Sequence, residues 1–281
     1  MDGLLINSED IYTDVTNTIL REHGRPDIPW SVKAKLQGRP GPEAGRLFHQ
    51  WAQLPMSDDE FSTRNSELQM EQFKHCKPLP GVARLLQNLS RATSGPLERK
   101  VHMAVATSSH AKMFRVKTSS DEAKLLFSRD IFSPEHVVCG DDPRVPQGRG
   151  KPLPDIYLTA LKTINQTIEA SGSGEPPVRP EECLVFEDAV PGCEAGRRAG
   201  CRVVWCPHEG LLAEYRGREK EVLAGATGEH RQEHLEHAGA SEFEASPGHV
   251  GEVDDGWAEL LLSLADFDYE KYGIRVPALL N

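Results

Sequence analysis

The sequence predicts an α/β fold in which a doubly wound parallel sheet carries an inserted helical domain. Two observations predict it. Short apolar runs alternate with stretches of helical spacing, as in a parallel sheet that helices cover on both faces. Polar residues that can do chemistry directly follow several of these runs, as expected where functional groups gather beyond the carboxyl ends of strands. The apolar runs are residues 101–106, 137–139, 183–186 and 203–205.

The N-terminal part of the chain has a different pattern. Residues 11–77 have helical spacing and few β-branched runs, with breaks at 24–26, 38–42 and 54–57. Ser57, followed three residues later by Glu60, has the pattern of a capped helix start. We therefore expect a small helical cap domain over residues 11–77, and a core that comprises residues 1–10 and 78–281.

The remaining elements of the core follow from the same patterns. Helical spacing at 155–161 and 192–200 predicts two helices between strands. The polar stretches 93–100 and 166–182 are expected to be loops. Residues 257–267 have helical spacing and are expected to pack back on the core.

One long polar segment, residues 217–256, is acidic, rich in glycine and poor in large apolar side chains. Such a segment cannot bury enough apolar surface to offset the entropy of ordering, so it is expected to be a disordered insertion. It carries His230, His234 and His237, whose helical spacing suits a metal ion. No cysteine accompanies them, and a solvated polar tract is the preferred interpretation.

Length and charge restrict the class of protein. The 281 residues suit one main core with a smaller inserted domain. The formal net charge of -11 argues against nucleic acid or an anionic membrane as the main partner. There is no apolar run of the roughly 20 residues that span a bilayer, and no secretory leader, so we expect a cytoplasmic protein. The six cysteines are scattered, which predicts buried thiols.

Four short motifs bear groups suited to phosphoryl chemistry. Cleaving a phosphomonoester needs a nucleophile, an acid for the leaving oxygen and positive charge for the phosphoryl oxygens. Singly the motifs are weak, because a Thr after a strand is usually a helix cap and a lone Lys is usually solvated. Their order along the chain gives them weight. They are Met1-Asp2-Gly3, Ala106-Thr107-Ser108-Ser109, Gly150-Lys151-Pro152 and Val185-Phe186-Glu187-Asp188.

The acidic pair Glu187-Asp188 is the strongest of the four. Mg²⁺ is a hard cation that takes oxygen ligands from one or two carboxylates, together with phosphate and water. An acidic pair at the end of a buried strand is costly unless a cation compensates it. The pair therefore predicts a Mg²⁺ site.

In this order the motifs resemble those of the haloacid dehalogenase-like (HAD) phosphohydrolases. Further runs are similar to the branch of that family that contains pseudouridine-5′-phosphatase and fungal relatives, namely residues 54–57, 106–109, 140–143 and 183–189. The resemblance covers about residues 1–208, and the insertion at 217–256 departs from it. It implies a Rossmann-like core with a helical cap. The activity it implies is Mg²⁺-dependent hydrolysis of a small phosphorylated metabolite, a sugar or nucleoside monophosphate, through an aspartyl-phosphate.

The resemblance also assigns roles to individual residues. Asp2 would protonate the leaving oxygen and then activate water, and its backbone carbonyl would be a metal ligand. Asp188 would bind the metal directly and Glu187 would assist. Thr107 would hold the phosphoryl oxygens, and Lys151 would neutralise their charge.

Substrate choice in this branch of the family belongs to the cap. Residues 35–39 resemble the cap loop that closes over the substrate. Gly38 and Arg39 are therefore candidate substrate-binding residues, with Glu43 as a further candidate. Ser108 is the corresponding candidate on the core.

The first motif of the family is D-x-D-G, and here Met1 occupies the x. The attacking Asp would directly precede Met1, so we expect the chain as given to be inactive and to lack the central strand. An incomplete gene model or a splice product is favoured over a phosphate-binding pseudoenzyme, because the other motif residues are retained. A phosphosugar mutase is the alternative activity. The expected oligomeric state is a monomer.

Overall fold

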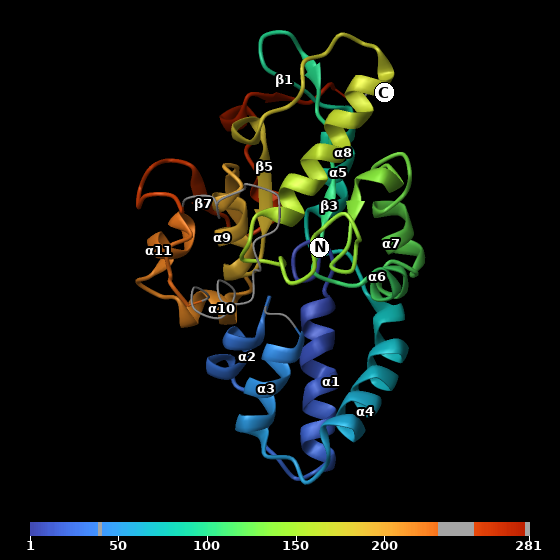
Figure 1. The fold of residues 1–281 in the computed structure, drawn as a ribbon, viewed down its shortest axis with the longest axis vertical. Helices are drawn as coiled ribbons and strands as arrows, with labels where there is room; N and C mark the ends of the chain where they lie inside the picture. Colours follow the sequence, from blue (N-terminus) through green and yellow to red (C-terminus); the bar gives the residue numbers. More distant parts are fainter. Residues whose placement is uncertain (39–40, 230–249, 279–281) are drawn as a thin grey trace.

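The computed structural model describes residues 1–38, 41–229 and 250–278. An α/β core carries a group of helices at one end, and the N-terminus lies where the two meet (Figure 1). A short 3₁₀ turn, η1 (Phe73–His75), leads from these helices back to the core. The helices, which are together called the cap below as a name for their position, are α1 (Ser8–Glu22), α2 (Trp30–Leu36), α3 (Gly41–Ala52) and α4 (Asp58–Gln72).

Two parallel sheets form the centre of the core. One contains β3 (Val105–Ala106) and β4 (Val137–Val138). The other has the order β5-β6-β7, with β5 (Leu184–Glu187), β6 (Arg202–Trp205) and β7 (Ala258–Leu260). Among the described residues no strand pairs with both β3 and β5. The parallel strands and their crossover helices confirm the expected α/β class.

The helices of the core follow the strands in sequence. α8 and α9 flank β5 along the chain, and α10 follows β6 and contacts the cap helix α2 (Figure 1). The core helices and 3₁₀ turns are α5 (Val82–Arg91), α6 (Ala111–Lys117), α7 (Asp121–Leu126), η2 (Pro134–His136), α8 (Asp155–Ser171), η3 (Pro180–Glu182), α9 (Val190–Arg198), α10 (Glu209–Glu214), α11 (Glu219–Ala224), η4 (Leu264–Asp266) and η5 (Glu270–Tyr272).

The strand β5 illustrates how the apolar runs are buried. Val185 packs in one hydrophobic cluster with Val203 of the neighbouring strand. Phe186, the next residue, packs against the larger cluster on the opposite face. Successive side chains of a strand point to opposite faces, so a strand that is apolar at every position must be covered on both sides.

The start of α4 is the expected one. Ser57 is the N-cap, its hydroxyl accepts a hydrogen bond from the backbone N–H of Glu60, and the Glu60 carboxylate accepts one from the backbone N–H of Ser57. This reciprocal pair satisfies two N–H groups that the helix leaves without partners. The capping box therefore fixes the point at which the cap turns into its last helix.

Two segments expected to be loops contain regular structure. Within 93–100, β1 (Thr93–Ser94) pairs with β2 (Arg99–Lys100), and β1 also pairs with β8 (Ile274–Arg275). Short edge strands need little apolar surface, and β8 comes from the far end of the chain, so local sequence carries no signal for this pairing. For the other segment, 166–182, the prediction of a loop was wrong at its start, because α8 continues to Ser171.

The prediction for residues 217–256 was wrong in its first part. α11 occupies Glu219–Ala224, with Val222 buried and Gly225 in the left-handed conformation (φ 70°) that ends many helices. The predicted helix at 257–267 is also wrong, because β7 and η4 occupy this range. β7 extends the sheet along the free edge of β6, and a short apolar run does not distinguish a strand from a helix.

The described cysteines are free thiols, four of them buried and two partly buried, as expected. Among the helices of the described residues, none is both long and apolar enough to cross a lipid bilayer.

Candidate active site

Residues of all four motifs meet where β3 and β5 end, next to the cap. Thr107 directly follows β3, and its hydroxyl lies 3.4 Å from Asp2 Oδ2. The Lys151 ammonium donates to the carbonyl of Ala106, the last residue of β3, at 3.3 Å. The same ammonium pairs with Glu187, the last residue of β5. One lysine thus contacts the carboxyl ends of both strands.

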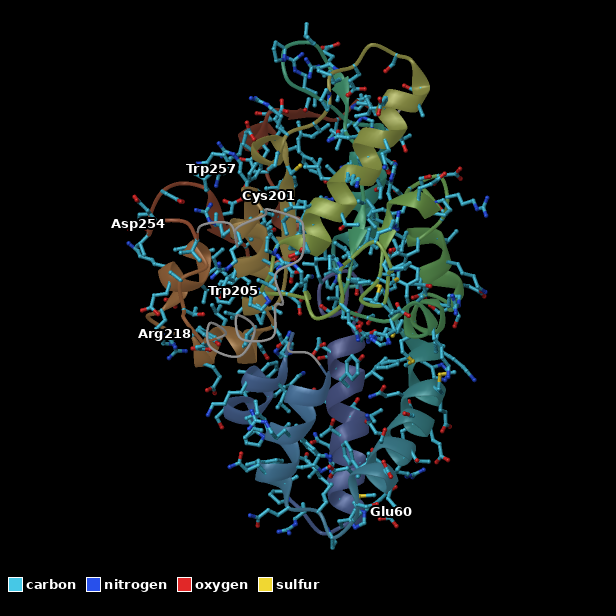
Figure 2. All side chains as sticks on the ribbon, viewed as in Figure 1. Glu60, Cys201, Trp205, Arg218, Asp254 and Trp257 are labelled. Carbon is cyan, nitrogen blue, oxygen red and sulfur yellow. The ribbon has the colours of Figure 1, made fainter. Side chains whose placement is uncertain are left out.

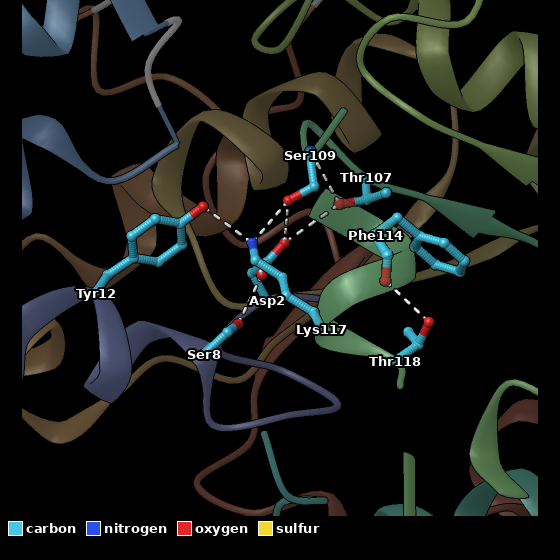
Figure 3. Close-up of polar contacts among 8 residues, drawn as sticks. All are labelled: Asp2, Ser8, Tyr12, Thr107, Ser109, Phe114, Lys117 and Thr118. Carbon is cyan, nitrogen blue, oxygen red and sulfur yellow. Dashed lines mark hydrogen bonds and ion pairs between the residues drawn. The ribbon is translucent and has the colours of Figure 1, made fainter. Parts of the chain in front are cut away.

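The Asp2 carboxylate is held from several sides (Figure 3). Ser8 Oγ donates to Asp2 Oδ1 at 2.6 Å, and Ser109 Oγ donates to Asp2 Oδ2 at 2.8 Å. The Lys117 ammonium forms an ion pair with Asp2 and also donates to Tyr12 Oη at 2.9 Å. α1 therefore supplies two of these contacts and α6 supplies the buried cation.

The charge of Lys117 decides the protonation state of Asp2. Burial alone would raise the pKa of the Asp2 carboxyl, but the Lys117 ammonium outweighs it and holds that pKa well below the usual range. Burial would lower the pKa of Lys117, yet Asp2 and Tyr12 raise it above its ordinary value. Lys117 is fully buried, and its ammonium also lies 4.7 Å from the ring centroid of Phe73. Asp2 is therefore a carboxylate in this arrangement.

The three hydroxyl groups in the segment after β3 differ in burial and in their contacts with the site. Thr107 is buried, and its Oγ1 accepts the backbone N–H of Ser109 at 3.2 Å. Ser109 faces Asp2, whereas the side chain of Ser108 is exposed. Gly140 allows the close approach of the β4 loop, because a Cβ there would lie 2.3 Å from the Ser108 carbonyl oxygen. Ser109, rather than Ser108, is the hydroxyl that contacts the site here.

Lys151 and Glu187 form a buried ion pair under the site. Their side chains are 8% and 6% exposed, and the Tyr157 hydroxyl also donates to Glu187. Burial would raise the pKa of Glu187, but Lys151 outweighs it and lowers that pKa. Gly192 of α9 is required for this packing, because a Cβ there would lie 2.1 Å from Glu187 Cδ. Glu187 thus uses its carboxylate to hold Lys151.

Asp188 lies at the contact between core and cap. Gln37, the residue that ends α2, donates its side-chain N–H to Asp188 Oδ2 at 2.7 Å. Gly3 lies against both Asp188 and Glu9, since a Cβ on it would lie 2.5 Å from Asp188 Oδ2 and 2.6 Å from Glu9 Cγ. Burial, followed by the charges of Glu187 and Glu9, raises the pKa of Asp188 well above its ordinary value.

This surrounding fits a cation. Asp188 has no positively charged hydrogen-bond partner among the contacts found in the described residues, and the buried Gln37 Oε1 beside it accepts no hydrogen bond. A cation here would lower the cost of the buried carboxylate and occupy the orphaned amide oxygen. No cluster of three His, Cys, Asp or Glu side chains is arranged for a metal in the described part of the chain. Mg²⁺ needs fewer protein ligands, because it keeps several waters.

The cap residues expected to bind substrate are only partly described. Gly38 has φ +77° and packs against Ala189 and Pro191 of the core, where a Cβ would come within 3.2 Å. Arg39 lies outside the described residues, and so do His230, His234 and His237. The side chain of Glu43 is likewise not described.

Several residues of the site were not expected from the sequence. All are polar side chains, and five of them lie on helices, where a polar residue is normally solvated; Gln37 follows α2 and Ser109 lies in the loop after β3. A polar residue within an otherwise apolar helical face is the one available signal, and it is too common to be specific. The additional residues are Ser8, Glu9, Tyr12, Gln37, Ser109, Lys117 and Tyr157.

A second contact joins the cap to the core away from these groups. The ring of Trp30 in α2 stacks on His208, with centroids 4.6 Å apart. Gly210 of α10 allows this approach, because a Cβ on it would lie 2.1 Å from Trp30 Nε1. The contacts of α2 with the core thus include Trp30 as well as Gln37.

Comparisons with known proteins identify the family and the fold. The model of a hydrolase family described as haloacid dehalogenase-like matches residues 1–200. A Saccharomyces cerevisiae protein described as a probable pseudouridine-5′-phosphatase is 42% identical over 80% of this chain and 87% of its own. The mitochondrial (DL)-glycerol-3-phosphatase 1 of Arabidopsis thaliana is 34% identical over 80% of this chain and 67% of its own. A mutant of CbbY from Rhodobacter sphaeroides, solved with xylulose-1,5-bisphosphate, has the same fold, with a TM-score of 0.58 and 20% identity over 95% of this chain and 92% of its own.

Proposed function

The chain belongs to the haloacid dehalogenase-like hydrolase family, and on that premise we propose that it acts on a small phosphomonoester at the ends of β3 and β5. The observation that supports this most is the convergence there of the Asp2 carboxylate, the Thr107 and Ser109 hydroxyl groups and Lys151, which come from three separate segments. The relatives described as phosphatases support the same class of reaction. Their names support a sugar, polyol or nucleoside monophosphate as the class of substrate.

We propose that the buried groups divide the work. The Asp2 side chain, oriented by Ser8 and Ser109, gives a proton to the leaving oxygen and afterwards accepts one from the water that cleaves the aspartyl-phosphate. The Thr107 hydroxyl and the backbone N–H groups after β3 bind the phosphoryl oxygens. Lys151, oriented by Glu187, offsets their negative charge.

Asp188 and the backbone carbonyl of Asp2 are the proposed ligands of a Mg²⁺ ion, with Gln37 as a further oxygen donor from the cap. When bound, the ion would neutralise charge on the transferring phosphoryl group. Gln37 joins the cap to this carboxylate, so the cap must open at this contact to admit a substrate and can close again on a small one.

We also propose that the attacking group is an Asp carboxylate that comes immediately before Met1 in the active enzyme, on a strand between β3 and β5. The support is the arrangement of the core. β3 and β5 belong to separate sheets in the described residues, yet Lys151 contacts the last residue of each. An extended segment between them would end beside Asp2, Thr107 and Lys151, where a nucleophile is needed.

The test measures phosphate release from a panel of sugar, polyol and nucleoside monophosphates. It compares the chain as given with a form that carries an apolar strand ending in Asp directly before Met1. We expect Mg²⁺-dependent release from the extended form, and loss of that release in EDTA. No release with any substrate would contradict the proposed activity. Isomerisation of a hexose phosphate without phosphate release would show a mutase instead.

A further inference from the structure

Two cysteines face each other at the ends of β5 and β6 that lie away from the motif residues. The strands are parallel, with Leu184 opposite Arg202 and Val185 opposite Val203. Cys183 and Cys201 directly precede the first pair, and the Arg202 backbone N–H donates to the Cys183 carbonyl at 3.0 Å. The two cysteines therefore lie side by side at the start of this ladder, one residue before its first pair.

Both side chains point to the same face of the sheet. Side chains alternate along a strand, so Cys183 shares a face with Val185, and Cys201 shares it with Val203. All four residues belong to the hydrophobic cluster between this sheet and α9. The Cys183 thiol donates to the Arg179 carbonyl at 3.4 Å, the Cys201 thiol lies 4.0 Å from the Ala199 carbonyl, and each thiol shifts the pKa of the other. Figure 2 shows Cys201 at the end of the sheet away from the cap, with Trp205 nearer to the cap.

We infer that Cys183 and Cys201 form a dithiol site that a hydroperoxide converts into an intramolecular disulfide. Neighbouring strands lie about 4.8 Å apart, which falls within the Cα separations of about 4.4 to 6.8 Å that disulfides tolerate. Because the two residues are already in register, the bond forms without moving either strand.

The two thiols differ in exposure and in pKa, and both differences make Cys183 the first to react. Cys183 is partly exposed, and Cys201 is buried. The hydrogen bond from Cys201 lowers the pKa of Cys183. The same hydrogen bond, together with burial, raises the pKa of Cys201. Cys183 is therefore the thiol that reacts first with an oxidant from solvent, and Cys201 is the thiol that resolves the product.

The chemistry balances with a hydroperoxide as the oxidant. With hydrogen peroxide, the Cys183 thiolate attacks one oxygen and the O–O bond breaks. Cys183 becomes a sulfenic acid and hydroxide leaves. The hydroxide takes up the proton that the Cys183 thiol had released and becomes water. Cys201 then attacks the Cys183 sulfur, the S–O bond breaks, and its proton leaves with the oxygen as a second water. The protein loses two hydrogens in total. The bond ties β5 to β6 and encloses α9 in the loop between them.

Peptide mapping of the intact chain tests this directly. The folded protein is treated with hydrogen peroxide at low molar excess, remaining thiols are alkylated, and the chain is cut with trypsin. Cleavage at Arg197, Arg198 and Arg202 puts Cys183 and Cys201 on different peptides. We expect a linked pair of peptides, about 2 Da lighter than their sum, that dithiothreitol separates. We also expect the oxidised protein to unfold several degrees higher than the reduced protein.

Matched variants identify the sulfurs. Cys193 lies on the same tryptic peptide as Cys183, so Cys193→Ala should keep the link and Cys183→Ser should remove it. Cys206→Ser, which removes the other partly buried thiol, should also keep it. Alkylation of both thiols after peroxide treatment, a link that survives Cys183→Ser, or a Cys183 that ends as sulfinic acid would overturn the inference. None of these readouts depends on phosphatase activity.

Discussion

Lys117 is the least expected residue of the candidate site. Its side chain is fully buried, and its charge is balanced by Asp2, which lies 115 residues earlier in the chain. A buried ion pair has little net stability over an apolar pair, but the loss of one partner leaves the other charge uncompensated. The pair therefore couples the position of the Asp2 carboxylate to the stability of the fold.

We predict that Lys117→Met lowers the free energy of unfolding by about 3 kcal/mol, because the partly buried Asp2 carboxylate then loses its ion-pair partner. The double variant Asp2→Asn/Lys117→Met should recover a large part of this loss. Urea unfolding monitored by fluorescence measures both. The control is Lys124→Met on α7, whose side chain is 61% exposed and which should change little. Equal losses in the single and double variants would contradict the coupling.

Asp188 is the residue at which the metal proposal can be tested alone. Asp188→Asn keeps the shape of the side chain but removes the charge that a cation needs, so we predict loss of Mg²⁺ binding in calorimetry. In the extended enzyme, turnover should fall at least about a hundredfold. Asp14→Asn, at an exposed position of α1, is the control for a generic change of charge. Unchanged Mg²⁺ affinity in Asp188→Asn would remove Asp188 from the metal site.

At the scale of elements, the capping box at the start of α4 stabilises the fold at a position far from the candidate site. Glu60 lies at the far tip of the cap (Figure 2). A substitution of Ser57 removes the side-chain half of the capping box that these two residues form. We predict that Ser57→Ala costs about 1 kcal/mol of stability, since it removes the N-cap oxygen. Ser62→Ala, an exposed position within the same helix, should be neutral or slightly stabilising. Equal melting temperatures for the two variants would argue against the cap.

The packing of α2 on α10 depends on a missing side chain. Gly210→Ala would force Trp30 away, because the added Cβ would lie 2.1 Å from the Trp30 ring. We predict a loss of about 1 to 3 kcal/mol from overpacking, and faster proteolysis in the linker 24–28 as the cap detaches. Gly45→Ala in α3 is the control, since nothing lies within 4 Å of the added Cβ. It should gain stability from helix propensity. Unchanged proteolysis of Gly210→Ala would show that this contact does not hold the cap.

At the scale of the whole molecule, the sequence predicted the features that local patterns determine. The β5 strand is an example. A short run that is apolar on both faces predicts a strand buried on both sides, and the Glu187-Asp188 pair that follows it must lie at the carboxyl end of that strand. The capping box of Ser57 is another. The sequence could not predict β8 or β7, because their partners lie far away along the chain. Lys117 and Gln37 were missed for the same reason, since each is an ordinary helix residue until the fold brings it to a carboxylate.

The division of the core into two sheets leads to the last prediction. β3 and β5 have no common partner among the described residues, so each leaves backbone N–H and C=O groups of one edge without a ladder partner. Unpaired buried groups cost about 1 to 3 kcal/mol each, against a total stability of roughly 5 to 15 kcal/mol.

A short apolar strand that ends in Phe-Asp and is fused before Met1 should pair with both edges. We predict that this fusion sharpens and raises the thermal transition, and that it brings Mg²⁺-dependent hydrolysis of p-nitrophenyl phosphate. The same strand ending in Phe-Asn separates the two effects, because it should restore the melt without the turnover. A cooperative melt and normal turnover from the unextended chain would show that the nucleophile is another residue and that Asp2 has a different role.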